Sequence, residues 1–176
     1  MLRLRDVMFH RKIQRETTFL QVPFSQIATV EGLEDFRNLE FLDLSNNLIE
    51  RLPSLAHLTQ LRVLDVSHNR LRELPALPPM LQQLKCAHNQ LTHLQSILMT
   101  RQLQYIDAGF NCLSQLPSQY EGRLFFLDLR ANQFRKKPQW AGFARTLLLE
   151  ENPLEPDVDH EEEPASGNGE SSNKEA

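Results

Sequence analysis

The stretch at residues 64–71 reads LDVSHNRL, and the same arrangement of residues returns at four other places in the chain. The counterparts are LDLSNNLI at 42–49, LKCAHNQL at 84–91, IDAGFNCL at 106–113 and LDLRANQF at 127–134. The apolar spacing and one asparagine are kept, whereas the acid, the hydroxyl and the histidine vary. A segment that recurs at a period in the 20s is the sign of a repeat architecture.

The repeat unit can be written L-x-x-L-x-L-x-x-N-x-L, with positions numbered 1 to 11. The five central copies begin at residues 39, 61, 81, 103 and 124, and weaker copies begin at 17 and 144. The steps between successive copies are 22, 22, 20, 22, 21 and 20 residues. Positions 4 and 6 are expected to point inward from a short strand, and positions 1 and 11 to close the same core.

The asparagine at position 9 is expected at the turn where the chain leaves each strand. Its amide carries two donor hydrogens and an acceptor oxygen, so it can satisfy buried backbone groups there. Repetition then predicts a ladder of stacked asparagines, formed by Asn47, Asn69, Asn89, Asn111, Asn132 and Asn152. Each unit buries little surface alone and depends on its neighbours for stability.

This pattern resembles the leucine-rich repeat family over residues 17–155, and the five central copies match nearly every position. Step lengths near 22 and the opening IATVEGLEDFRNLEFLDLSNN look like the short intracellular class, which includes the phosphatase-regulator type. One unit, LPALPPMLQQLKCAHNQL, resembles instead the 20-residue class of bacterial effectors. The resemblance implies an α/β leucine-rich repeat solenoid, a right-handed curved coil with a parallel concave sheet of about seven short strands.

Positions 3, 5 and 7 of the unit should face away from the core, because neighbouring residues of a strand point to opposite faces. Position 3 is mostly large and apolar or aromatic, and position 5 is mostly aspartate. Soluble monomers rarely expose a contiguous apolar stripe without a use for it. The predicted partner-binding residues are Phe19, Phe41, Asp43, Asp65, Lys85, Tyr105, Asp107, Phe126 and Asp128. Aspartate at position 5 is common in the family, so an alternative role is to stabilise the end of the strand.

The spacing of the polar residues disfavours both hydrolytic catalysis and metal binding. Asp65 and Ser67 should share one face of an extended strand while His68 points to the other, which does not place an imidazole between acid and hydroxyl. His68 and His88 occupy the same position of adjacent units, but that column offers no third ligand for zinc. We expect a non-enzyme without a cofactor or a metal.

The ends of the chain differ from the repeats in composition. Residues 1–16 are rich in arginine, which favours a cap over the first repeat; a mitochondrial targeting segment is the alternative. Residues 1–149 hold 13 acids and 18 bases, whereas residues 150–176 hold ten acids and one base. The tail at 156–176 has hardly an apolar residue, so we expect it to stay disordered. The alternative is an acidic arm that screens the basic body or binds a basic partner.

The cysteine usage favours a reducing compartment, because Cys86 fills a core position and Cys112 belongs to a different position of the next unit. The expected location is the cytoplasm, with the nucleus or the mitochondrion as alternatives. No apolar run is long enough to span a membrane.

The expected function is a non-catalytic interaction module or adaptor that binds, on its concave face, a protein partner presenting apolar and basic side chains. We expect a monomer that binds neither membrane nor nucleic acid. The basic run FRKKPQW at 134–140 keeps a nucleic-acid-associated, ribonucleoprotein role as an alternative. A repeat protein like the bacterial effectors is a second alternative.

Overall fold

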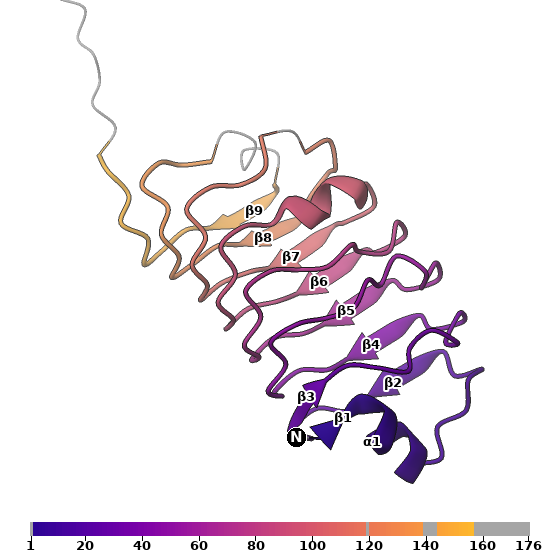
Figure 1. Ribbon diagram of the computed structural model, residues 1–176. Helices are drawn as coiled ribbons and strands as arrows, with labels where there is room; N and C mark the ends of the chain where they lie inside the picture. Colours follow the sequence, from indigo (N-terminus) through magenta and orange to yellow (C-terminus); the bar gives the residue numbers. More distant parts are fainter. Residues whose placement is uncertain (1, 119, 139–143, 157–176) are drawn as a thin grey trace, which may run out of the picture.

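A computed structural model describes residues 2–118, 120–138 and 144–156. The chain winds as a coil in which each turn adds one short strand to a single parallel sheet (Figure 1). The strands follow one another in chain order: β2 (Phe19–Gln21), β4 (Phe41–Asp43), β5 (Val63–Asp65), β6 (Gln83–Lys85), β7 (Tyr105–Asp107), β8 (Phe126–Asp128) and β9 (Thr146–Leu148). The predicted parallel sheet of seven short strands is confirmed.

The pairing of the strands follows the register of the repeat. Like positions of neighbouring units lie opposite each other, as in Phe41 against Val63 and Leu42 against Leu64. The shorter step between the units that begin at 61 and 81 does not disturb this register, since Val63 pairs with Gln83. The variation in length is therefore absorbed in the connecting segments, and the columns predicted at positions 3 and 5 are continuous.

The core runs along the inside of the coil as one cluster. Position 4 of each central unit, which is the middle residue of its strand, is fully buried, as are positions 1, 6 and 11 of most units. Cys86 is buried at position 6 and Phe134 at position 11, so both fill core positions as the sequence predicts. Both cysteines are free thiols.

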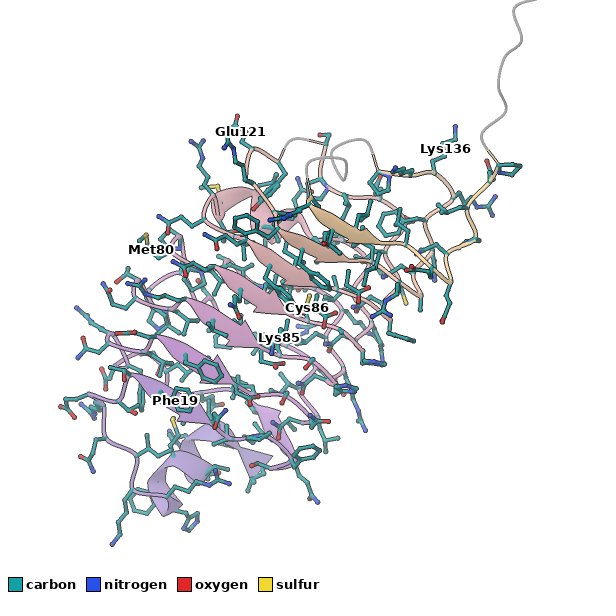
Figure 2. The ribbon with its side chains drawn as sticks, turned by 180° about the vertical axis from the view of Figure 1, so that it is seen from behind. Phe19, Met80, Lys85, Cys86, Glu121 and Lys136 are labelled. Atoms are coloured by element: carbon teal, nitrogen blue, oxygen red, sulfur yellow. The ribbon has the colours of Figure 1, made fainter. Side chains whose placement is uncertain are left out.

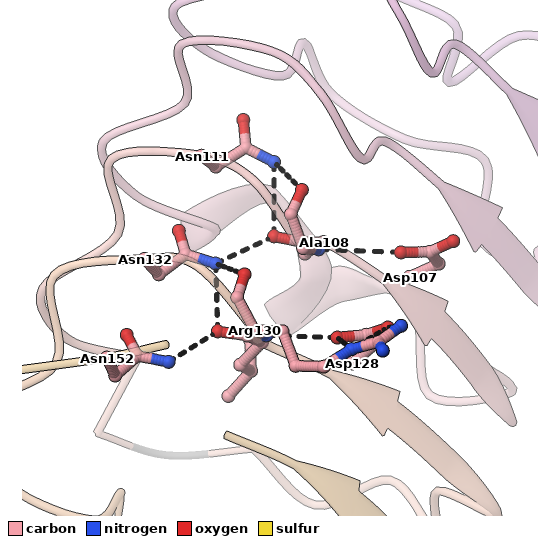
Figure 3. A network of polar contacts seen from close by, with 9 residues as sticks. Asp107, Ala108, Asn111, Asp128, Arg130, Asn132 and Asn152 are labelled. Atoms are coloured by element: carbon pink, nitrogen blue, oxygen red, sulfur yellow. Dashed lines mark hydrogen bonds and ion pairs between the residues drawn. The ribbon is translucent and has the colours of Figure 1, made fainter. Parts of the chain in front are cut away.

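The asparagine ladder is confirmed, and Figure 3 shows part of it. Asn132 Nδ2 donates to the carbonyl oxygens of Leu129 and Arg130 in its own turn, and to that of Ala108 in the preceding turn. Its Oδ1 accepts the backbone N–H of Leu113. Each amide thus links two turns of the coil and satisfies backbone groups that would otherwise be buried without partners.

Position 8 of the unit adopts a left-handed backbone conformation in every copy. Values of φ lie between 50° and 62° at Phe24, Asn46, His68, His88, Phe110, Ala131 and Glu151. Asparagine and histidine are enriched in this conformation, whereas phenylalanine, alanine and glutamate are not. The repeating turn therefore imposes the conformation, because residues with no preference for it adopt it as readily as Asn46.

The N-terminal segment packs onto the first turns of the coil. Strand β1 (Leu2–Arg3) pairs with β3 (Ile27–Thr29), and helix α1 (Leu4–His10) follows at once. Three apolar side chains of α1, those of Leu4, Val7 and Met8, are buried in the common core. The predicted domain boundaries and the two roles considered for residues 1–16 stay predictions.

Among the described residues, the segments that connect the strands are mostly irregular, with turns, bends and one 3-10 helix, η1 (Gln95–Met99). At the C-terminal end the coil is less closed, since Leu147 and Leu149 are only half-buried and Leu154 is 41% exposed. Residues 157–176 of the predicted acidic tail, and Trp140 of the basic run, lie outside the described residues. Across the described ranges, none of the helices has the length and apolar character needed to cross a membrane.

Candidate functional site

The concave face is defined here as the surface formed by positions 3 and 5 of the seven strands. In the central strands the middle residue is buried and its two neighbours are half-buried or exposed, as the alternation of a strand requires. Phe19 lies toward the N-terminal end of this sheet and Lys85 near its middle (Figure 2). All nine predicted partner-binding residues therefore belong to one surface.

The aromatic side chains of the concave face form two stacked pairs. The rings of Phe19 and Phe41 have centroids 4.3 Å apart with an angle of 16° between their planes. The rings of Tyr105 and Phe126 lie 4.5 Å apart at 7°. The parallel register causes this stacking, because it places like positions of neighbouring strands side by side. Val63 and Gln83 separate the two pairs.

The aspartates at position 5 share one structural role. In each case Oδ1 accepts the backbone N–H of position 7, two residues further along the chain. The donors are Ser45 for Asp43 (2.9 Å), Ser67 for Asp65 (3.0 Å), Gly109 for Asp107 (3.4 Å) and Arg130 for Asp128 (2.9 Å). These bonds stabilise the turn at the end of the strand, as the family-based alternative anticipates.

Two of the four aspartates are paired with cations. Asp128 is 4% exposed, and both of its oxygens accept hydrogen bonds from the Arg130 guanidinium, the shortest at 2.6 Å. Asp65 lies 3.8 Å from Lys85 Nζ. Among the described residues, neither Asp43 nor Asp107 has an ion-pair partner. The position 5 aspartates that lack an ion pair in the described part of the chain therefore lie on two strands only, β4 and β7.

The environment of Asp107 disfavours its charge. Burial raises the pKa of this carboxyl, and the carboxylates of Asp128 and Asp65 raise it further, against the hydrogen bond from the Gly109 N–H and the charge of Arg130, which both lower it. Burial and then the charge of Asp107 raise the pKa of Tyr105. A cation placed beside Asp107 would offset this unfavourable charge.

Arg130 is a residue of this face that the sequence reasoning missed. It occupies position 7, two residues after Asp128, so both side chains project from the same side of the chain. The sequence signal that could have identified the pair is an arginine two residues after an aspartate in an extended segment. Its guanidinium removes Asp128 from the set of free acids on the concave face.

The geometry of LDVSHNRL does not bring an acid, an imidazole and a hydroxyl into a relay. The Ser67 hydroxyl donates directly to Asp65 Oδ1 at 2.5 Å. The His68 ring stacks instead on His88, with centroids 4.2 Å apart, and His88 stacks on Phe110 at 4.3 Å. In the described parts of the chain, no group of three or more His, Cys, Asp or Glu side chains is placed to share a metal ion.

The model of the family "Leucine Rich repeats (2 copies)" matches residues 37–79. No curated protein matches the chain at a significant level. Among solved structures, an LRR protein of Leptospira interrogans, LIC12759, is 26% identical with a TM-score of 0.63, over 74% of this chain and 38% of that chain.

Two further structures resemble the coil. A chain in the octameric complex of Latrophilin 3, Unc5D and the LRR of FLRT2 is 25% identical with a TM-score of 0.63, over 70% of this chain and 42% of that chain. The leucine-rich repeat domain of APL1 is 20% identical with a TM-score of 0.68, over 80% and 45% respectively. The chain spans less than half the length of each of these relatives, and its fold is a leucine-rich repeat solenoid.

Proposed function

We propose that this protein is a non-catalytic interaction module, or adaptor, that binds a protein segment on its concave face. The observation that carries the proposal is the exposure of two stacked aromatic pairs on the face opposite the core. Phe19 is 54% exposed, and Phe41, Tyr105 and Phe126 are half-buried. Aromatic residues dominate the energetics of interfaces, and truncating one at a hot spot costs about 2 kcal/mol or more.

The chemistry of the face indicates the kind of partner. Apolar side chains of the partner would cover the aromatic pairs, and basic side chains would lie near Asp43 and Asp107. Charge complementarity of this kind favours association rate and specificity more than affinity. The likeness to an LRR protein solved in complex with Latrophilin 3 and Unc5D supports a role in protein association, although what FLRT2 binds belongs to that protein.

The proposal also assigns roles within the predicted set of nine residues. Asp128 and Lys85 serve the face mainly through their bonds to Arg130 and Asp65, so their replacement should alter its charge balance rather than remove a direct contact.

We further propose membership of the short intracellular class and a location in the cytoplasm. The free thiols of Cys86 and Cys112 support this location.

The test uses partners recovered by proximity labelling in the native cell and confirmed with purified proteins. The variant Tyr105→Ala/Phe126→Ala should lose binding by at least tenfold while its circular dichroism spectrum is unchanged. A matched control removes two exposed aromatics that lie outside the columns, Phe24→Ala/Phe125→Ala, and should bind normally. Loss of binding in the control alone would place the interface elsewhere and overturn the proposal.

A further inference from the structure

The uncompensated charge of the concave face is not spread evenly. The position 5 column runs Asp43, Asp65, Lys85, Asp107 and Asp128 across β4 to β8. Lys85 offsets Asp65, and Arg130 offsets Asp128. Among the described residues, the acids of this column without an ion-pair partner are therefore Asp43 on β4 and Asp107 on β7, the second and fifth strands of the sheet.

Each of these two acids lies beside one of the aromatic pairs. Phe41 precedes Asp43 by two residues on the same strand face, and it stacks on Phe19. Tyr105 precedes Asp107 in the same way, and it stacks on Phe126. A stacked ring pair with a carboxylate that has no ion-pair partner among the described residues thus occurs twice on one surface, with the second ring on the preceding strand at Asp43 and on the following strand at Asp107.

The free atoms of this arrangement suit a cationic side chain. Oδ1 of each acid is engaged by the position 7 N–H, while Oδ2 accepts no hydrogen bond from the described residues. An arginine can lay its alkyl stem and planar guanidinium along a ring and still donate an N–H to a carboxylate oxygen. A lysine can satisfy the charge and lie over the ring as a cation.

Resting on the proposed concave-face function, we infer that this face holds two like subsites for cationic side chains, one at Phe41 and Asp43 and one at Tyr105 and Asp107. The partner presents two arginine or lysine residues to them. Strands β4 and β7 are three steps apart in the sheet, and neighbouring strands are separated by about 4.8 Å, so the two cations lie about 14 Å apart.

Lys85 makes the two subsites distinct. It stands between them in the column and pairs with Asp65, so the middle of the column offers no unpaired acid to a third cation. A basic residue of the partner placed between its two cations therefore gains no ion pair there, and an apolar or neutral residue serves equally well.

The experiment uses a displayed library of random 16-residue peptides, selected on the purified full chain. Peptides that lose binding to Tyr105→Ala/Phe126→Ala, and hence bind the concave face, should carry two basic residues. Each basic residue of one such peptide is then changed to alanine and measured against Asp43→Asn and Asp107→Asn. Asn keeps the oxygen that accepts the position 7 N–H while removing the charge.

Each Asp→Asn change should weaken the binding of the parent peptide about two- to fivefold, which corresponds to the upper part of the range for exposed ion pairs. One peptide residue should couple to Asp43 and the other to Asp107, so that the Asp→Asn loss vanishes once its own arginine or lysine is gone. The control Glu73→Gln removes one exposed acid away from this face and should have no effect.

Three results would overturn the inference. These are selected peptides without basic residues, an Asp→Asn loss that persists whichever of the two cations the peptide has lost, or an equal loss in Glu73→Gln, which would indicate bulk charge alone. In each of these cases loss of binding in Tyr105→Ala/Phe126→Ala would still support the proposed concave-face function. If no selected peptide depends on that aromatic pair, both the inference and the proposed function fail.

Discussion

Replacing Asn89 with alanine tests how the ladder holds the coil together. Asn89 Oδ1 accepts the backbone N–H of Leu71 at 2.9 Å. Its Nδ2 donates to the carbonyl oxygens of Val66, Cys86 and Ala87 at 3.0–3.2 Å. All of these groups lie in the interior of the turn, so a lost partner is not simply replaced by water.

The cost follows from which backbone groups lose their last partner. The three carbonyls keep other donors, which are Asn69 Nδ2, Asn111 Nδ2 and the His68 N–H. The Leu71 N–H has no second acceptor among the described residues. One buried N–H without a partner costs about 1–3 kcal/mol. We expect Asn89→Ala to lower the free energy of unfolding by about 2 kcal/mol, and the melting temperature by about 4–8 °C for a chain of this size.

The first rung of the ladder should be more sensitive. Ser25 stands at position 9 of the preceding unit, so no asparagine there shares the carbonyl of Val22. Removing Asn47 leaves the Ser25 N–H, the Ile27 N–H and the Val22 carbonyl without the bonds that Asn47 provides. Asn47→Ala should therefore cost at least about twice as much as Asn89→Ala.

Asn46→Ala is the matched control, because it removes an amide from the adjacent position outside the ladder. Its expected cost is about 1 kcal/mol or less, from the left-handed backbone that asparagine tolerates better than alanine. Urea unfolding followed by circular dichroism measures all three variants. Equal stability of Asn46→Ala and Asn89→Ala would refute the ladder argument, and an Asn47→Ala variant no weaker than Asn89→Ala would refute the sharing of carbonyls.

Four further predictions follow from individual residues. Ala131→Gly should raise the free energy of unfolding by about 0.5–1 kcal/mol in the same urea assay, because Ala131 has a φ of 50°. Asp107→Asn should be more stable than the parent at neutral pH. The raised pKa of Asp107 in the folded state means that stability is lost as pH rises through it, so melting curves should converge below the ordinary value of 3.8. Burial raises the pKa of the Cys86 thiol, so a thiol reagent at pH 7.5 should modify Cys112 in the native protein and Cys86 only on unfolding. Removal of residues 157–176 should leave the melting temperature nearly unchanged, as expected from composition, and a large loss of stability would show that they dock on the body.

The sheet, its register and the core could be predicted because they repeat. Seven copies of the same spacing fix which residue of each strand points inward, and the pairing of like positions follows from stacking the copies. The asparagine ladder was predictable for the same reason. Position 9 is occupied by asparagine in six of seven units, and only a shared local role in the turn explains that constancy.

Features that depend on one unit alone could not be predicted in this way. The sequence gives little sign of the left-handed conformation at position 8, because Phe110 and Ala131 have no preference for it. The repeating turn overrides the preference of the single residue. The pairing of Asp128 with Arg130 was missed because four aspartates in one column were treated as equivalent, while a neighbouring side chain in one unit changes the state of its acid.

We propose that the aspartate of LDVSHNRL and its counterpart Asp43 serve two functions through two oxygens. Oδ1 holds the turn that ends the strand, and Oδ2 is directed to a cation, from the protein at Asp65 and from the proposed partner at Asp43. Replacement by alanine would remove both roles at once, so a loss of binding in such a variant would not distinguish a missing contact from a relaxed turn. Asparagine keeps an oxygen for the N–H of position 7 and removes the charge. For this reason the charge of Asp43 can be separated from its structural role, and a frequent family residue can be tested for a specific function.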